Sequence, residues 1–228
     1  MGRQDVNPDR QGDSGQTPLS WAAGNGYDGV VKPLLQLEDV DPNRPDNRGQ
    51  TPLLRAAKEG HGGVVKLLLG LEGVNPDRPD SDGQTPLSWV VENGHDGVVR
   101  LLLRRKDVNP DISDNYGETP LSLAARNGRD GVVKLLLERG DVRPDRLGNH
   151  GQTPLSLAAC HGHDSVVKIL LGREDVSPDR PDNRGRTPLL LPARYGHGKV
   201  VKILKSRKAI TPTWYKAPRN DPSPRLRT

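Results

Sequence analysis

The sequence feature that most constrains the fold is a phrase that returns every 34 residues. It reads GQTPLSWAA at its first occurrence, and the six units that it opens start at Gly15, Gly49, Gly83, Gly117, Gly151 and Gly185. Residues 5–9 match the unit ending at residues 107–111, so a partial unit precedes residue 15, as expected of a piece of a longer array. A fixed period of this length predicts a solenoid of stacked supersecondary units.

The residues inside one unit predict two short antiparallel helices and a turn. Thr17 can cap the first helix with its hydroxyl oxygen, and Pro18 fits the first helical position, where no backbone N–H is needed. Gly26 can end that helix in the left-handed conformation, and Asp28 offers a cap for the second helix. Residues 46–49 have the Asp-first, Gly-fourth pattern of a type I turn, which we expect to project between units as a finger.

The composition excludes a single conventional globular core. Of the 228 residues, 32% are apolar and 3% aromatic, too few for one compact core of this length, whereas stacked units need only a thin apolar layer. No apolar run approaches the roughly 18 to 20 residues that span a bilayer, and the first residues lack the apolar stretch of a secretory signal. Because the only cysteine, Cys160, fits a reducing compartment, we expect an intracellular protein of the cytoplasm or nucleus, without a membrane partner.

The positive charge is concentrated at the C-terminal end of the chain. Residues 205–228 hold seven bases and one acid, a net charge of +6 against +5 for the whole chain, so residues 1–204 sum to −1. Four prolines in the same stretch predict a basic, disordered tail after an array of residues 1–204. The array therefore lacks the field that attracts nucleic acid, and polyanion binding by the tail is the alternative function. Residues 104–106, Arg-Arg-Lys, are interpreted as a solvated loop.

The repeated phrases resemble the ankyrin repeat family. The family pattern T-P-L-x-x-A-A-x-x-G-H-x-x-V-V-x-x-L-L is matched over nearly all of residues 1–204. The resemblance implies an all-α ankyrin-repeat solenoid of six helix-turn-helix units with projecting fingers, a monomer that binds a protein partner without catalysis. Phrases such as GQTPLSWAA and DGVVKLLL look most like arrays attached to fungal NACHT-type signalling NTPases, which implies the sensor arm of a larger protein.

One departure from the family pattern recurs in every unit. The family's His after T-P-L is replaced here, and the residues at that position are Ser20, Leu54, Ser88, Ser122, Ser156 and Leu190. In the family that His forms hydrogen bonds to the finger, so in this chain those bonds must be replaced or lost.

Catalysis is not predicted, because almost every reactive side chain belongs to the repeat period. His61, His95, His163 and His197 share one position in their units, which favours a structural role. Residues 160–163, Cys-His-Gly-His, are the only patch that imitates a thiol nucleophile or a metal site, and they fall one ligand short of a closed zinc site. No phosphate-binding loop occurs. We therefore expect no catalytic residue, metal or cofactor.

The candidate binding residues are those that differ between units. In ankyrin repeats the positions before the Thr and at the end of the first helix line the concave face and contact partners, although exposed positions also drift freely. The predicted partner-binding residues are Gln50, Lys58, Glu59, Gln84, Glu92, Asn93, Tyr116, Glu118, Arg126, Asn127, Gln152 and His161. Tyr116 and Arg126 belong to no repeated core position, so we expect their replacement to leave stability almost unchanged.

Overall fold

The computed structural model describes residues 7–208, and there the chain folds into twelve helices without a strand. The first helices of successive pairs are α1 (Pro18–Gly24), α3 (Pro52–Lys58), α5 (Pro86–Asn93), α7 (Pro120–Arg126), α9 (Pro154–Cys160) and α11 (Leu190–Arg194). The second helices are α2 (Asp28–Leu34), α4 (Gly62–Leu69), α6 (Asp96–Leu103), α8 (Asp130–Leu137), α10 (Asp164–Leu171) and α12 (Gly198–Lys208). The predicted all-helical solenoid is confirmed.

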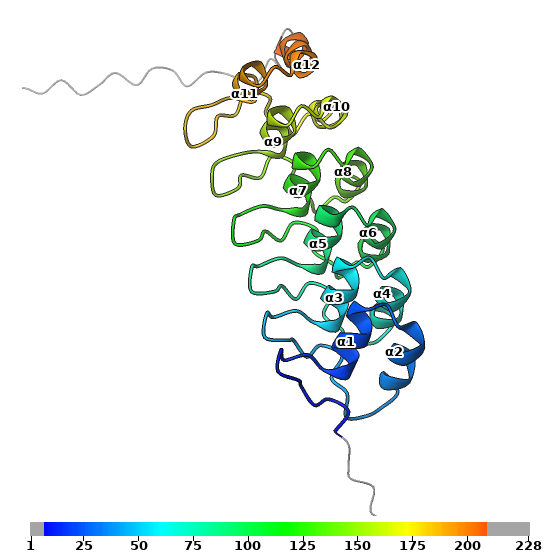
Figure 1. Cartoon of the computed structure of the whole chain (residues 1–228). Coiled ribbons are helices and arrows are strands. Elements are labelled where there is room, and N and C mark those ends of the chain that lie inside the picture. Colours follow the sequence, from blue (N-terminus) through cyan, green and yellow to red (C-terminus); the bar gives the residue numbers. More distant parts are fainter. Residues whose placement is uncertain (1–6, 209–228) are drawn as a thin grey trace, which may run out of the picture.

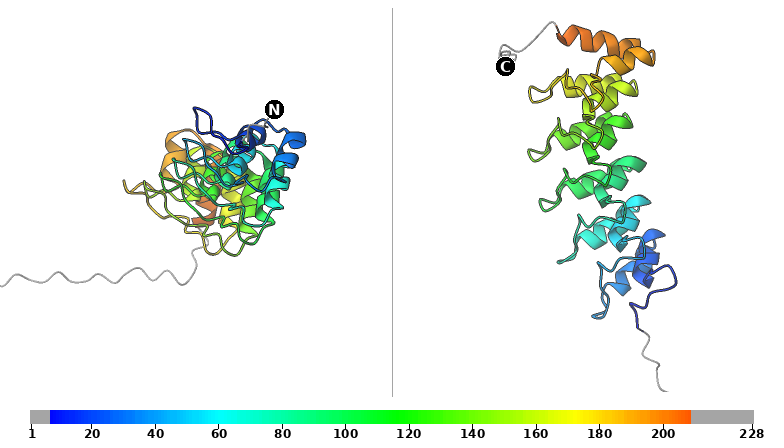
Figure 2. Two further views of the ribbon diagram at one scale, coloured as in Figure 1. Left: turned by 90° about the horizontal axis from the view of Figure 1, so that it is seen from below. Right: turned by 90° about the vertical axis from the view of Figure 1, so that its left-hand side faces the viewer.

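The helix pairs stack in two layers (Figure 1). The first helices form one layer and the second helices the other, and the finger loops project from the side of the first helices. Two further views show the units following one another along a single axis (Figure 2). The fingers and the first helices therefore share one side of the molecule.

The first helices of the first five units begin as the sequence predicts, and the second helices do not. Thr17 Oγ1 accepts a hydrogen bond from the Ser20 N–H at 3.0 Å, and Gly26 has a φ of 71°. The cap of α2, however, is Tyr27, which makes no side-chain hydrogen bond, and Asp28 is the first helical residue. The predicted Asp28 cap is therefore wrong. Its carboxylate lies instead in the first turn, where it interacts favourably with the positive end of the helix dipole.

The core is a thin apolar layer that runs the length of the stack. Leu19, Ala22 and Val31 of the first unit are fully buried, and so are their counterparts in the next four units. One continuous cluster of buried side chains extends from Leu19 to Leu204. The small Ala side chains let neighbouring first helices approach closely, so each unit is covered mainly by the units before and after it.

Arginines tie the second helices of successive units together. Arg139 Nη1 donates to the carbonyl of Leu103 at 3.1 Å, and Nη2 donates to the carbonyl of Val108 at 3.0 Å. A hydrogen bond from the same guanidinium holds the pKa of Asp141 below its usual range. Arg105 and Arg173 repeat the contact with the carbonyls of Leu69 and Leu137. Arg105 is therefore a cross-unit donor, which corrects the interpretation of residues 104–106 as only a solvated loop.

Both terminal units carry a proline inside a helix. In the last unit, the first helix, α11, has only five residues and no side-chain cap. Pro192 explains this, because it lacks an N–H and its ring would clash with the carbonyl of Pro188 in a helix starting there. Pro33 lies within α2, which is one residue shorter than α4.

The C-terminal helix extends beyond the expected end of the array. We expected the solenoid to stop at residue 204, and α12 continues through Lys205 to Lys208. Leu204 is buried, and Lys205 and Ser206 in the same helix are exposed. The rest of the predicted tail, residues 209–228, lies outside the described residues.

Amide hydrogen exchange should be fastest in the two terminal helix pairs when measured at low protein concentration. Each terminal unit packs against one neighbour instead of two, and an interior proline costs about 3 kcal/mol. Replacing Pro33→Leu should slow exchange in α2, and the control Pro33→Gly should not. Equal protection of all twelve helices would contradict this expectation.

Candidate interaction surface

Aspartates hold the finger turns from inside. Asp46 Oδ1 accepts hydrogen bonds from the backbone N–H groups of Arg48 and Gln50, both at 2.9 Å, and the Asp46 carboxylate is buried. The expected turn is closed by the Gly49 N–H, which donates to the Asp46 carbonyl at 2.9 Å. The same carboxylate contacts recur at Asp80, Asp114 and Asp182. Gly148 takes this position in the fifth finger, which keeps only the backbone bonds.

Asparagines connect four of the fingers to the one before, and Ser81 Oγ takes this role in the third finger by donating to the Arg48 carbonyl at 2.8 Å. Asn149 Nδ2 donates to the carbonyl of Asn115 at 3.0 Å, and Asn183 Nδ2 donates to the carbonyl of Asn149 at 2.9 Å. Asn47 and Asn115 make the same contact with the carbonyls of Asp13 and Ser81. The ladder therefore joins separate loops into one surface.

The aspartate turns and the asparagine bonds replace the hydrogen bonds that the family's His makes to the finger. The serines that replace it stay local: Ser156 Oγ donates to the Thr153 carbonyl at 2.8 Å, and Ser88 Oγ lies 3.0 Å from Thr85 Oγ1. Neither hydroxyl reaches a finger through these bonds. The fingers are held instead by their own aspartates and by the asparagine ladder, a signal that was present in the sequence as a repeated Asp-Asn pair.

The periodic histidines join the end of one first helix to the next unit. His61 Nε2 lies 3.2 Å from the carbonyl of Gly24, and His95 Nε2 lies 3.0 Å from the carbonyl of Lys58. His163 lies 2.8 Å from the carbonyl of Arg126 in the same way. These carbonyls lack partners within their own helices, so the histidines act as caps supplied by the following unit.

Trp89 is a contact residue that is not among the predicted binding residues. Its Nε1 donates to Asp80 Oδ2 at 2.8 Å, and Lys58 Nζ lies 3.7 Å from the centre of its ring. Lys58, a predicted site residue from the preceding unit, thus stacks on an aromatic face. In the second unit Arg55 occupies the Trp position and pairs with Asp46 at 3.3 Å.

A charged network lies at the middle of the finger side. Arg126 Nη1 lies 2.6 Å from Glu118 Oε2, and Arg126 Nη2 lies 3.9 Å from Glu92 Oε1. Gln84 Nε2 donates to Glu92 Oε2 at 3.0 Å, which extends the network to the third finger. Burial raises the pKa of Glu118, the positive charge of Arg126 opposes that rise, and the negative charge of Asp114 adds to it. Arg126 therefore stabilises the ionised form of Glu118.

The structure brings some of the predicted site residues together and separates others. Gln84, Glu92, Glu118 and Arg126 form the network. Tyr116 lies in the turn of the fourth finger, and 67% of its surface is exposed. Gln50 is corrected: only 6% of it is exposed, so its side chain is not available to a partner. The predicted residues outside the network fall into two groups, with Glu59, Asn93, Asn127 and His161 exposed and Lys58 and Gln152 half-buried.

Arg126 also corrects the expectation about stability. Its ion pairs with Glu118 and Glu92 mean that truncation leaves a half-buried carboxylate without its cation. We therefore expect Arg126→Ala to raise the pKa of Glu118 further and to destabilise the fold. Tyr116, in contrast, is exposed and remains a position where truncation should change stability little.

Cys160 does not have the surroundings of an activated thiol. It is half-buried, and burial raises its pKa, which disfavours the reactive thiolate. The neighbouring His161 Nδ1 lies 2.9 Å from the Leu157 carbonyl, and its ring stacks on that of His163. Within residues 7–208, no group of three potential ligands is placed to hold a metal ion.

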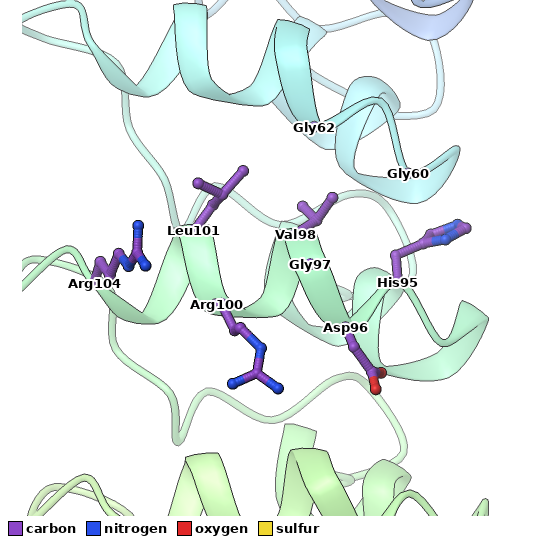
Figure 3. Close-up of a pocket in the computed structure, with 9 residues that line it drawn as sticks. All are labelled: Gly60, Gly62, His95, Asp96, Gly97, Val98, Arg100, Leu101 and Arg104. Carbon is purple, nitrogen blue, oxygen red and sulfur yellow. The ribbon is translucent and has the colours of Figure 1, made fainter.

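A hollow of about 440 Å³ lies between α4 and α6 (Figure 3). Gly60, Gly62 and Gly97 contribute only backbone to its walls, and the side chains of Arg100 and Arg104 line it on the α6 side. It follows the gap between successive second helices, away from the fingers. Among the described helices, none is long and apolar enough to cross a membrane.

Comparisons with known proteins agree on one family. The sequence model described as "Ankyrin repeats (3 copies)" matches residues 2–80, 56–147 and 140–213. The solved ankyrin repeat protein EF0377 is 26% identical, with a TM-score of 0.76, over 82% of this chain and 96% of that chain. Comparison with curated proteins gave no match.

Two further solved structures have the same TM-score of 0.76. The ankyrin repeat domain of Bcl-3, described as a unique member of the IkappaB family, is 26% identical over 87% of this chain and 86% of that chain. An ankyrin repeat domain from Acinetobacter baumannii AYE is 24% identical over 84% of this chain and 97% of that chain, which shows the fold alone.

Replacing Asp114→Ala should loosen the finger that carries Tyr116. The change removes the acceptor of the Tyr116 and Glu118 N–H groups, and leaving buried donors unpaired costs about 1 to 3 kcal/mol. The measurement is denaturant unfolding together with amide exchange at these two residues. Asp114→Asn is the matched control, because its amide oxygen can still accept. Equal losses in both variants would show that the acceptor is not what holds the turn.

Proposed function

The chain belongs to the ankyrin repeat family, whose repeat domains generally mediate protein–protein interaction, and on that premise we propose that it binds a protein partner on its finger and first-helix side. We count six full units, from Gly15 onward, in this noncatalytic module.

The observation that carries the proposal is the charged network beside Tyr116. Most positions of a unit repeat along the array, whereas no other unit has a Glu at the position of Glu92 or of Glu118, and only Arg194 matches Arg126. They offer both charge signs, and the exposed Tyr116 lies two residues before Glu118 in the same finger, a combination that suits a polar protein surface with one apolar anchor. Tyr and Arg are the residue types that most often dominate binding energy.

The finger ladder supports recognition by a preformed surface. The asparagine bonds and the aspartate turns fix the loops before a partner arrives, so less conformational entropy is lost on binding. With helix layers about 8 to 10 Å apart, six units offer a surface about 50 Å long. That length is enough for a standard interface of about 800 Å² per partner.

The proposal extends to the setting of the array. The resemblance of its phrases to arrays of fungal NACHT-type NTPases supports a role as the sensor arm of a larger signalling protein inside the cell, in the cytoplasm or nucleus. The alternative function, polyanion binding, rests on residues 205–228, most of which lie outside the described residues. A gel-shift titration separates the two, because tail binding to nucleic acid would weaken steeply with salt.

The proposal is tested by affinity capture from the source cells with variants of the two sides. Tyr116→Ala together with Arg126→Ala should weaken partner binding by about 2 kcal/mol or more if both are hot spots. Tyr116→Ala alone separates binding from folding, because Arg126 and its ion pairs stay intact. The matched control is Arg100→Ala with Lys134→Ala, two exposed positions on the second helices. Binding that survives the first pair and is lost with the second would place the partner on the other side.

A further inference from the structure

The two ends of the solenoid expose apolar side chains at positions that are buried in every other unit. Val30 in α2 is 48% exposed, whereas its counterparts Val64, Val98, Val132, Val166 and Val200 are at most 3% exposed. Leu190 in α11 is 54% exposed, whereas its counterparts Ser20, Leu54, Ser88, Ser122 and Ser156 are at most 3% exposed. Pro18 at the first end is exposed where its counterparts are buried, and Val201 at the last end is half-buried where its counterparts are buried.

The repeat itself shows what covers these positions elsewhere. The Val30 position is exposed only in the first unit, so in the others the preceding unit covers it. The Leu190 position is exposed only in the last unit, so in the others the following unit covers it. We call the exposed face with Pro18 and Val30 the leading face, and the exposed face with Leu190 and Val201 the trailing face. Every internal junction of the stack is a trailing face against a leading face.

The polar groups at the two faces also match the internal junctions. Gly26, Gly60, Gly94, Gly128 and Gly162 each lie against a His or Arg side chain of the next unit. Gly196, the same position in the last unit, has open space around it among the described residues. On the leading face, Tyr27 occupies the periodic His position, is 47% exposed and carries a hydroxyl that can donate to a helix-end carbonyl.

The two ends carry opposite charge. Residues 7–41 contain six acids and two bases, a net charge of −4. Residues 185–206 contain five bases and no acid, a net charge of +5. Like ends therefore repel each other and unlike ends attract, which favours one orientation of association.

We propose that the trailing face of one copy of this chain docks on the leading face of a second copy and continues the repeat stack across the junction. The second copy is the occupant that the observations favour, because it offers the complementary repeat face and the opposite charge together. The contact is head-to-tail, so it leaves one free face at each end and produces linear assemblies rather than closed dimers. The proposal departs from the expected monomer and is independent of the finger-side partner.

Sedimentation velocity on the full chain over a wide range of concentration tests the proposal. The wild-type chain should form elongated assemblies that dissociate at low concentration and in high salt. Val30→Glu blocks the leading face and Leu190→Glu blocks the trailing face. Each should weaken self-association by about a hundredfold or more, because the junction would bury an unpaired carboxylate. Both positions are exposed and lie in first helical turns, where an acidic side chain is tolerated.

Mixing the two variants gives the decisive measurement. The Val30→Glu chain keeps its trailing face and the Leu190→Glu chain keeps its leading face, so the mixture should form a dimer and stop there. Leu147→Glu, which replaces an exposed leucine in the fifth finger, away from the leading and trailing faces, is the matched control and should assemble like wild type.

Three results would overturn the proposal. The wild-type chain could stay monomeric at every concentration, which would also be the outcome if other residues of the chain covered the faces. One variant could self-associate as strongly as wild type, which would indicate contact between like ends. The mixture could remain monomeric although circular dichroism shows both variants folded.

Discussion

Each helix pair in this chain buries its apolar stripe only against the pairs before and after it. Leu19, Ala22 and Val31 belong to a core that is only as thick as one unit. They are buried only when the adjacent unit stacks on them in the correct register. This constraint explains the low apolar content of the sequence and the thin core. It also explains why the ends differ from the middle, since an end unit has the same side chains and one neighbour fewer.

Polar contacts between units fix the register that apolar stacking leaves loose. The guanidinium of Arg139, the imidazole of His95 and the amide of Asn149 each reach a carbonyl of the preceding unit. Apolar contacts are not directional, whereas these hydrogen bonds are formed only when successive units are correctly placed. They act at three levels of the cross-section, at the second helices, the first-helix ends and the fingers. The finger surface is therefore ordered by the same stacking that forms the core.

The candidate interaction surface is the part of the chain that departs from the period. Glu118 replaces the Gln found at the corresponding position of the first, second, third and fifth units. Burial raises the pKa of Glu118 and so favours its neutral form, and the neighbouring charge of Arg126 opposes this. The ion pair with Arg126 thus keeps a charge at a site that the frame does not require. A charge that has no role in stacking is available for an ion pair or hydrogen bond with a partner, as recognition requires.

The sequence by itself determined the repeat, the helix pairs and the Thr-Pro helix starts, because these depend on short-range contacts whose residues recur at fixed spacing. It also identified Gln84, Glu92, Glu118 and Arg126 as candidates by their variation between units. It did not reveal that they touch. Gln84 meets Glu92 and Glu118 meets Arg126 within single units, where the finger folds back toward the first helix, and the Arg126–Glu92 pair depends on how closely successive units stack. Burial of Gln50 and the contact of Lys58 with Trp89 were decided in the same way. Only the tertiary structure fixes which side chains of neighbouring units meet, because a contact between residues about 34 positions apart depends on the rise and rotation between units, which no local pattern encodes.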